Sequence, residues 1–438
     1  MHHEASCDTR FAARWTSGVL VVFTLLGTGF GSWLSRLPAL RDHLGASTFQ
    51  MSLIGLTLAL GSVTGLILSG RTVSRFGARR VLAVFVITQT VMLPLAATLF
   101  WVGLVAPAVA ALVVFGFTFA TSDVAMNVSG AGAERALGKP RMSLFHAGYS
   151  LGSVASMGLG ALAEHVGVAV PVHLGVVYVI VLIGVFAALR VLPGGVELDH
   201  TSVDRPTQAE AELLELPVQS VHTGPIEIVA APAEASHDAQ AERLDRPGAQ
   251  SQRGYTPWRD PRILVIGLIA MSMSLAEGTA SDWLPLALAD GRGFPNDTAA
   301  LLLAVFFVSM TLTRLSGAWV LPRFGRVTVL RVGAVLIAVG VAATILVPSP
   351  VVIIAGAILW GIGCAFGFPI GISAAADDPK TAVRGVAAVS AIAYTAFLLG
   401  PMLIGFLGEH LGLLRAFWPL AGFALFVFIA AGVARERR

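Results

Sequence analysis

The feature that most constrains this chain is a series of apolar runs, each about twenty residues long. A helix rises about 1.5 Å per residue, so a run of this length crosses the hydrocarbon core of a bilayer, which is about 30 Å thick. Only 13% of the 438 residues are charged, against roughly a quarter in soluble domains. A transmembrane β-barrel is excluded, because its strands are alternating segments of about ten residues. The sequence therefore predicts an all-α membrane protein.

Twelve runs are long enough to cross the membrane as helices. The first is expected to be a retained anchor and not a cleaved signal peptide, because its apolar stretch is too long and no A-x-A-like cleavage site follows it. The twelve predicted spans cover residues 14–35, 49–70, 81–100, 104–128, 143–163, 170–192, 262–287, 298–320, 329–348, 351–375, 385–408 and 415–434.

The basic residues divide unequally between the two sides of the predicted membrane. With both termini in the cytoplasm, 25 of the 29 Lys and Arg residues fall on or next to cytoplasmic segments. The external loops then carry only Arg36, Arg41, Arg292 and Arg415. Cytoplasmic loops of membrane proteins are enriched in Lys and Arg. We therefore expect both termini to be cytoplasmic.

A polar segment separates the sixth span from the seventh. Residues 194–253 hold 11 of the 26 acidic residues and have no sustained apolar period, which is typical of a disordered chain. A short amphipathic helix at 209–217 and a regulatory role stay open. The chain is thus expected to divide into an N-terminal half at 1–193, a cytoplasmic linker at 194–258 and a C-terminal half at 259–438.

The six spans before this linker resemble the six after it. GSWL at 31–34 recurs as SDWL at 281–284, and LSG followed by RFG occurs in both halves. The interval from Tyr to a Glu-His pair is also repeated, in Tyr149, Glu164 and His165 and in Tyr394, Glu409 and His410. Several matches in one order at nearly one offset predict two homologous six-helix halves. This architecture is common among secondary transporters.

The loop between the second and third spans, GRTVSRFGARR at 70–80, resembles the signature of the major facilitator superfamily. The resemblance extends over essentially the whole chain and implies the fold of that superfamily. Ser74 and, in the second half, Pro322 stand where the superfamily usually has an aspartate that helps to latch the cytoplasmic gate. This departure puts an acid-based latch in doubt.

The basic and glycine residues of the two matching loops remain candidates for a gate. Their arginines can meet the partial negative charge of helix C-termini, and glycine permits the tight turn at position 77. The alternative is that the arginines only fix the topology. The candidates are Gly70, Arg75, Gly77, Arg79, Arg80, Arg323, Gly325 and Arg326.

DVAMN at 123–127 and SLFHAGYSLGS at 143–153 are similar to segments of the fucose permease branch and its bacterial relatives. This resemblance implies a secondary active transporter in the plasma membrane, which is the inner membrane of a bacterium. The implied partners are a small polar solute, such as a sugar or related metabolite, together with protons and the lipid bilayer. No cofactor and no nucleic acid are expected, and the chain is expected to be a monomer.

Three carboxylates lie within the predicted spans, where a charge costs about 2.5–3.5 kcal/mol and usually faces a partner or a cavity. Asp123 matches the essential acid of the permease branch and is the predicted proton-coupling residue, although it can instead pair with an arginine. Asn127 is one turn on and faces the same side. Glu277 is expected to face the cavity. Asp282 is expected near the external end, where it either joins a site or anchors the helix.

Other candidates are aromatic or basic. Trp33 and Trp283 are equivalent in the repeat and can stack on a sugar, but tryptophan near a helix end is more often an interfacial anchor. His146 and Tyr149 begin the fifth span and can bind a polar ligand or relay a proton, while His146 can equally be an interfacial residue. Arg314 is expected to snorkel to the cytoplasmic side rather than pair with an acid.

The sequence argues against an enzyme. GYSLG at 148–152 matches G-x-S-x-G, but it lies in an apolar run where the strand, turn and helix of a nucleophile elbow cannot form. No Walker loop, HExxH motif or cysteine cluster is present, so no catalytic or metal site is expected. Two functions compete with solute import. One is a proton-antiporting exporter of drugs or metabolites, and the other is a receptor that uses the linker as its output.

Overall fold

The computed structural model describes residues 2–139, 141–193, 256–378 and 381–436. All regular structure in these ranges is helical. The predicted linker lies outside them except for its last three residues, 256–258. A short 3₁₀-helix, Pro257–Arg259, leads from there into the second half of the chain.

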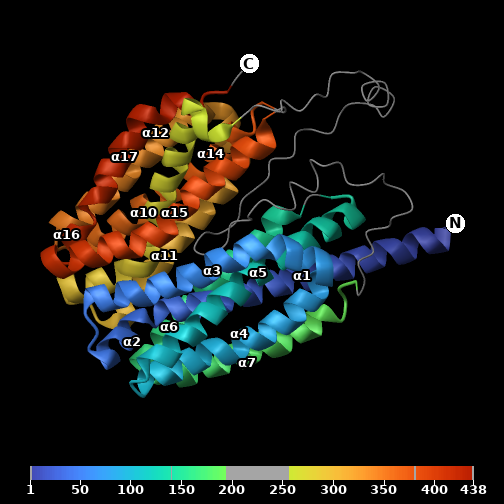
Figure 1. The fold of residues 1–438 in the computed structure, drawn as a ribbon, viewed down its shortest axis with the longest axis horizontal. Helices are drawn as coiled ribbons and strands as arrows, with labels where there is room; N and C mark the ends of the chain where they lie inside the picture. Colours follow the sequence, from blue (N-terminus) through green and yellow to red (C-terminus); the bar gives the residue numbers. More distant parts are fainter. Residues whose placement is uncertain (1, 140, 194–255, 379–380, 437–438) are drawn as a thin grey trace.

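The first half forms one bundle, drawn in blue and green in Figure 1. Within it, α1 packs against α6, and α3 and α4 pack against α5. Its helices are α1 (His2–Ser35), α2 (Leu37–Leu44), α3 (Thr48–Phe76), α4 (Ala78–Trp101), α5 (Val105–Leu137), α6 (Met142–His165) and α7 (Val170–Leu189).

The second half forms another bundle, drawn in yellow to red in Figure 1. Within it, α10 packs against α15, and α12 packs against α13 and α17. Its helices are α10 (Pro261–Arg292), α11 (Asn296–Leu315), α12 (Gly317–Leu346), α13 (Pro350–Cys364), α14 (Gly367–Ala375), α15 (Ala382–Leu411), α16 (Leu413–Ala416) and α17 (Trp418–Ala430), followed by the 3₁₀-helix Ala431–Ala434.

Eleven spans within the described ranges are long and apolar enough to cross a membrane. The remaining predicted span corresponds to α6, which has 24 residues but is richer in polar side chains. α6 packs against α1 and, in the other bundle, against α11. Protein therefore covers much of the one crossing helix that is poorly suited to lipid.

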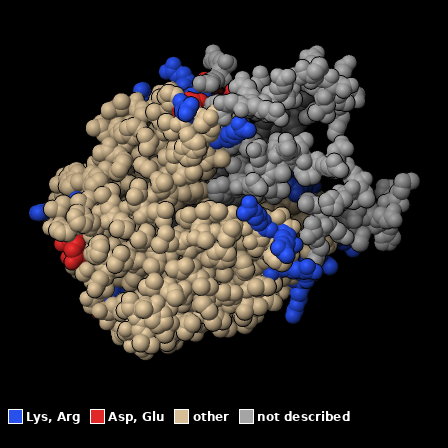
Figure 2. All heavy atoms as spheres, viewed as in Figure 1, with Lys and Arg blue, Asp and Glu red and all other residues tan. Residues whose placement is uncertain are grey.

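The outer surface suits a hydrocarbon environment. Large apolar side chains point outward, and Ile67, Val351 and Ile429 are 71%, 75% and 69% exposed. On the face that Figure 2 shows, a broad surface between the charged groups carries no Lys, Arg, Asp or Glu. Contiguous apolar surface of this size marks contact with a partner or a membrane, and the helix lengths favour a membrane.

Small residues let helices of the first bundle approach one another closely. A β-carbon at Gly27 of α1 would collide with the carbonyl group of Tyr149 on α6, and one at Gly61 of α3 with the carbonyl group of Val113 on α5. Lipid provides no hydrophobic drive for one helix to meet another, so van der Waals packing of this kind holds a transmembrane bundle together.

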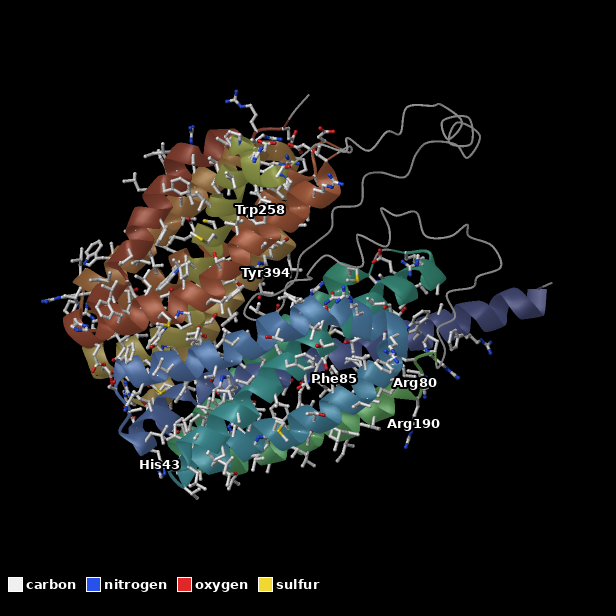
Figure 3. The ribbon with its side chains drawn as sticks, in the orientation of Figure 1. His43, Arg80, Phe85, Arg190, Trp258 and Tyr394 are labelled. Atoms are coloured by element: carbon white, nitrogen blue, oxygen red, sulfur yellow. The ribbon has the colours of Figure 1, made fainter. Side chains whose placement is uncertain are left out.

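The two bundles meet at one end of the molecule and diverge toward the other (Figure 1). Both chain termini lie toward the diverging end, which we call the terminal end. α2 and α16 lie at the opposite end, which we call the distal end. In Figure 3, Arg80 and Arg190 mark the terminal end of the first bundle, and His43 marks its distal end. Between the bundles, α3 packs against α15 and α6 against α11.

Candidate functional site

A cavity of about 1200 Å³ lies between the two bundles. His146, Ala147 and Ser150 of α6 line one wall, and residues of α11, α12 and α14 line the other. Arg326 and Arg435 belong to the lining as well. Because these two arginines lie at the terminal end, the cavity reaches the side on which the bundles diverge.

At the distal end, polar groups of one bundle bind polar groups of the other. These contacts close the cavity on that side in this conformation. They are Asn296 to Asp42 at 2.7 Å and to Glu164 at 3.4 Å, His165 to Asp297 at 3.0 Å, the Phe49 backbone N–H to Glu409 at 3.1 Å, and an ion pair between Arg41 and Asp290.

Asp123 is buried on α5, with 4% of its surface exposed. The side-chain amide of Asn127 donates to its carboxylate at 3.1 Å and to its backbone carbonyl at 3.0 Å, which is the geometry expected for two residues one turn apart. The carboxylate lies within electrostatic reach of Tyr149 on α6 and of Tyr394 on α15. Figure 3 labels Tyr394 near the gap between the bundles. Asp123 therefore interacts electrostatically with a residue of each bundle.

Glu277 of α10 pairs with Arg314 of α11. Arg314 Nη2 donates to Glu277 Oε2 at 2.9 Å, and the exposed fractions of the two side chains are 10% and 2%. The expectation that Arg314 snorkels away from acids is therefore wrong. A buried guanidinium beside a buried carboxylate gains more from pairing than from stretching toward water, because each charge alone would be poorly solvated.

A break in a helix fixes Arg314 from its other side. α13 ends at Cys364 and α14 begins at Gly367, so this crossing is interrupted at Ala365. Pro369, four residues after Ala365, has no N–H to give to the Ala365 carbonyl group. Arg314 Nε donates to that carbonyl at 2.9 Å instead. Interrupted helices with freed backbone carbonyls commonly form the binding sites of secondary transporters.

Of His146 and Tyr149, only His146 lines the cavity. His146 is 7% exposed, stands edge-on to the ring of Phe23 at 5.0 Å, and lines the cavity. It is thus a buried residue between the bundles, and the interfacial alternative is wrong. Tyr149 is not among the described residues that line the cavity, and it lies within electrostatic reach of Asp123.

Trp33, Trp283 and Asp282 lie apart from this cavity. They line a small pocket of about 30 Å³, where α1, α3, α10 and α15 meet. The two tryptophans are 3% and 2% exposed, so the expectation that they are interfacial anchors is wrong. Asp282 is not near the end of its helix either, because α10 continues through Pro285 to Arg292.

The two signature loops have similar backbones but different partners. Gly77 and Gly325 have φ angles of 80° and 73°, a region that glycine adopts without strain. Arg75 lies over the ring of Phe76, and Arg323 over that of Trp319, each at 5.4 Å.

Only the second loop has a carboxylate partner in the part of the chain that is described. Arg326 binds Asp377 and Ser373 at 2.7 and 2.8 Å, and Arg262 binds the same carboxylate at 2.7 Å. No ion pair of Arg79 or Arg80 occurs among the described residues, and Gly70 lies within α3. The described residues also hold no group of three His, Cys, Asp or Glu side chains that could bind a metal ion.

Two further residues of this region were not predicted as candidates. Tyr394 could have been found, since the repeat makes it the counterpart of Tyr149. Arg36 was counted as an external loop residue, but it is 2% exposed and binds Glu164 at 3.0 Å and the Gly160 carbonyl group at 3.2 Å. No local pattern distinguishes such a buried arginine from a loop arginine.

Comparison with known proteins identifies relatives over nearly the whole chain. Residues 266–438 match the model of the Major Facilitator Superfamily. The chain is 29% identical to an uncharacterized transporter of Sinorhizobium fredii, over 96% of this chain and 98% of that protein. It is 27% identical to an uncharacterized MFS-type transporter of Yersinia pestis, over 94% of this chain and 93% of that protein.

Two solved transporter structures resemble this one. The nucleoside transporter NupG gives a TM-score of 0.71 at 15% sequence identity, over 97% of this chain and 100% of NupG. A D-xylose-proton symporter gives a TM-score of 0.62 at 15% identity, over 96% of this chain and 97% of that protein. At this level of identity the likeness concerns the fold.

Proposed function

We propose that this chain, which belongs to the Major Facilitator Superfamily and is a transporter and not an enzyme, moves its solute by secondary active transport. The proposed solute is small and polar. The observation that carries the proposal is the cavity between the bundles, which reaches the terminal end and is closed by polar contacts at the distal end. In alternating access, two halves rock about a central site so that it opens to one side at a time. The conformation described here corresponds to one such state.

Sugars and nucleosides are the solute classes that we favour. Two proteins of the same fold carry such solutes by name, a nucleoside transporter and a D-xylose-proton symporter. The cavity presents His146, Ser150 and Arg314, which together offer imidazole, hydroxyl and guanidinium groups to a hydroxyl-rich solute. The narrower resemblance to the fucose permease branch stays a prediction.

Proton coupling is assigned to Asp123. A charged carboxylate is costly in a buried site unless its surroundings solvate it, and the groups near Asp123 come from both bundles. Rocking of the bundles changes those surroundings, so the free energy of protonation differs between the two end states. A proton and a solute that both prefer one state are thermodynamically linked.

The terminal end is proposed to face the cytoplasm. Arg80 and Arg190 lie at this end (Figure 3), and 25 of the 29 Lys and Arg residues fall on or next to the segments that the sequence predicts to be cytoplasmic. Membrane proteins retain Lys and Arg on the cytoplasmic side. In that orientation the described conformation is open to the cytoplasm.

An exporter of amphipathic compounds is the second candidate function. The wall of the second bundle carries, besides its polar groups, several large apolar side chains, among them Leu321, Phe324, Phe366 and Ile370. Such a wall favours a solute with an apolar part. An exporter with this fold would take up its solute from the open cavity and release it at the distal side.

Reconstitution into liposomes tests the proposal and its alternative. Radiolabelled uridine and D-xylose are offered outside, with and without an inward pH gradient, and an amphipathic dye is offered in the same way with the gradient reversed. Accumulation of uridine or xylose that an uncoupler abolishes supports the proposed carrier. Movement of the dye alone favours the exporter, and movement of no compound contradicts both.

A further inference from the structure

We propose that Glu277 and Arg314 form a solute-binding subsite in the wall of the second bundle. The subsite takes a neutral group that presents a hydrogen-bond donor beside an acceptor, as the edge of an amide or a vicinal diol does. This inference rests on the proposed transport function and specifies the chemistry that one part of the solute must have.

The evidence is a pair of polar atoms that the protein leaves without partners. One oxygen of Glu277 and one nitrogen of Arg314 bind each other at 2.9 Å. The other oxygen, Oε1, and the other nitrogen, Nη1, are buried and make no hydrogen bond within the described residues. Buried polar atoms in native proteins nearly always have a partner. An unpaired acceptor and an unpaired donor on two side chains that bind each other therefore indicate a group from outside the chain.

The position of the pair suits a subsite. Arg314 and Ala365, whose carbonyl group binds Arg314 Nε, both line the cavity, whereas Glu277 does not line it and is reached through its contact with Arg314. His146 and Ser150 line the facing wall, on the other bundle. A solute that reaches the pair from the cavity therefore lies between groups of both bundles, as alternating access requires.

The two unpaired atoms also restrict the charge of the bound group. A carboxylate or phosphate would suit Arg314 but would be repelled by Glu277, and an ammonium group would have the opposite difficulty. A neutral N–H or O–H next to an oxygen satisfies both atoms. A water molecule can do the same, so water is the competing occupant.

Ligand binding to the purified full-length protein in detergent distinguishes a solute-binding subsite from a position that water occupies. Uridine, whose base has an N–H between two carbonyl groups, is compared with 3-methyluridine, in which the methyl group replaces that hydrogen. D-xylose is compared in the same way with 2-deoxy-D-xylose. We expect the wild-type protein to prefer the unmodified member of at least one pair by about tenfold or more, the size of effect of a hydrogen bond to a charged group.

Glu277→Gln should abolish this preference. The amide oxygen of the new glutamine keeps the bond to Arg314 Nη2, so its amide nitrogen takes the place of Oε1. The subsite then offers two donors, this nitrogen and Arg314 Nη1, and no acceptor. Asp282→Asn is the matched control, because it removes a carboxylate from the same helix that faces the small distal pocket, and it should keep the preference. Arg314→Lys retains an ion pair but lacks the second nitrogen, and it provides the same test if Glu277→Gln does not fold.

Two results would overturn the subsite. One is an unchanged preference in Glu277→Gln or Arg314→Lys, and the other is a wild-type protein with no preference in either pair, which would assign the position to water. The assay needs neither a gradient nor turnover. If the protein takes up solute but shows no preference for the unmodified ligand, only the subsite is contradicted. If it shows the preference but takes up no solute, only the carrier function is contradicted.

Discussion

The two ends of the molecule are built differently. At the distal end, complementary groups face each other across the bundles, as in Asn296 with Asp42 and His165 with Asp297. At the terminal end, the ion pairs of Asp377 with Arg262 and Arg326 lie within the second bundle. The distal contacts therefore hold the bundles together, whereas these terminal ion pairs stabilise one bundle by itself.

This difference indicates which conformation is favoured. In the proposed alternating access, closure of the terminal end would bring together two loops rich in arginine, and Ser74 and Pro322 stand where an acid would offset their charge. To open the distal end, it must break several polar contacts, although each exposed ion pair contributes only about 0–1 kcal/mol. We expect the conformation open at the terminal end to predominate without solute.

The largest effect is expected from locking the distal end. Asp42→Cys with Asn296→Cys, in a chain that carries Cys7→Ser and Cys364→Ser, replaces a contact of 2.7 Å between the bundles with a disulfide. Oxidation should reduce uptake in liposomes at least about 100-fold, because the distal end can no longer open, and a reductant should restore it. Each single cysteine variant, oxidised alike, is the control. Full uptake by the cross-linked protein would show that these contacts do not separate during transport.

A smaller effect is expected from supplying the missing acid. Ser74→Asp places a carboxylate beside Arg75, where it offsets the positive charge of the two loops. This should favour closure of the terminal end by about 1 kcal/mol, or about fivefold. The measurement is the rate at which a membrane-impermeant maleimide alkylates Ser150→Cys in the cavity from the terminal side. Ser74→Asp should slow it, and the neutral Ser74→Asn should not. Equal rates in the two variants would contradict the assignment of this loop to the gate.

The smallest effect is expected from a single exposed distal contact. His165 is 72% exposed where it binds Asp297, so the pair contributes little. His165→Asn should slow the same alkylation by no more than about twofold. A change of tenfold or more would mean that one surface pair controls the distal end, and that its other contacts are secondary.

The sequence predicted the helices well because their signal is local. The predicted span at 104–128 corresponds to α5, which runs on to Leu137, and the prediction stopped early because the last turns are polar. The turn at Gly77 could also be predicted from the sequence, since a tight turn requires a glycine at a fixed place, and the repeat makes Gly325 its counterpart.

The groups that charged residues bind could not be predicted from the sequence in this way. Arg314 was expected to reach toward water because nothing in TLTRLSG shows that Glu277 lies beside it, on another helix. Trp33 and Trp283 were expected at the membrane interface because the sequence places them near helix ends. Their burial arises where the two bundles meet, and the sequence does not show that contact. Asp123 was identified because a carboxylate in an apolar run is a local anomaly. The tyrosines near it depend on the packing of α6 and α15.

The most direct test of the account is transport by Asp123→Asn in proteoliposomes, with uridine or D-xylose as the solute that the wild type accumulates. Asparagine keeps the shape and the contact with Asn127 but cannot carry the coupled proton. We expect no accumulation of solute against its gradient when a pH gradient is imposed, while exchange of labelled for unlabelled solute down its own gradient persists; Asp123→Glu should keep partial accumulation. If Asp123→Asn still concentrates the solute with an unchanged proton flux, Asp123 is not the coupling residue and the account is wrong at its centre.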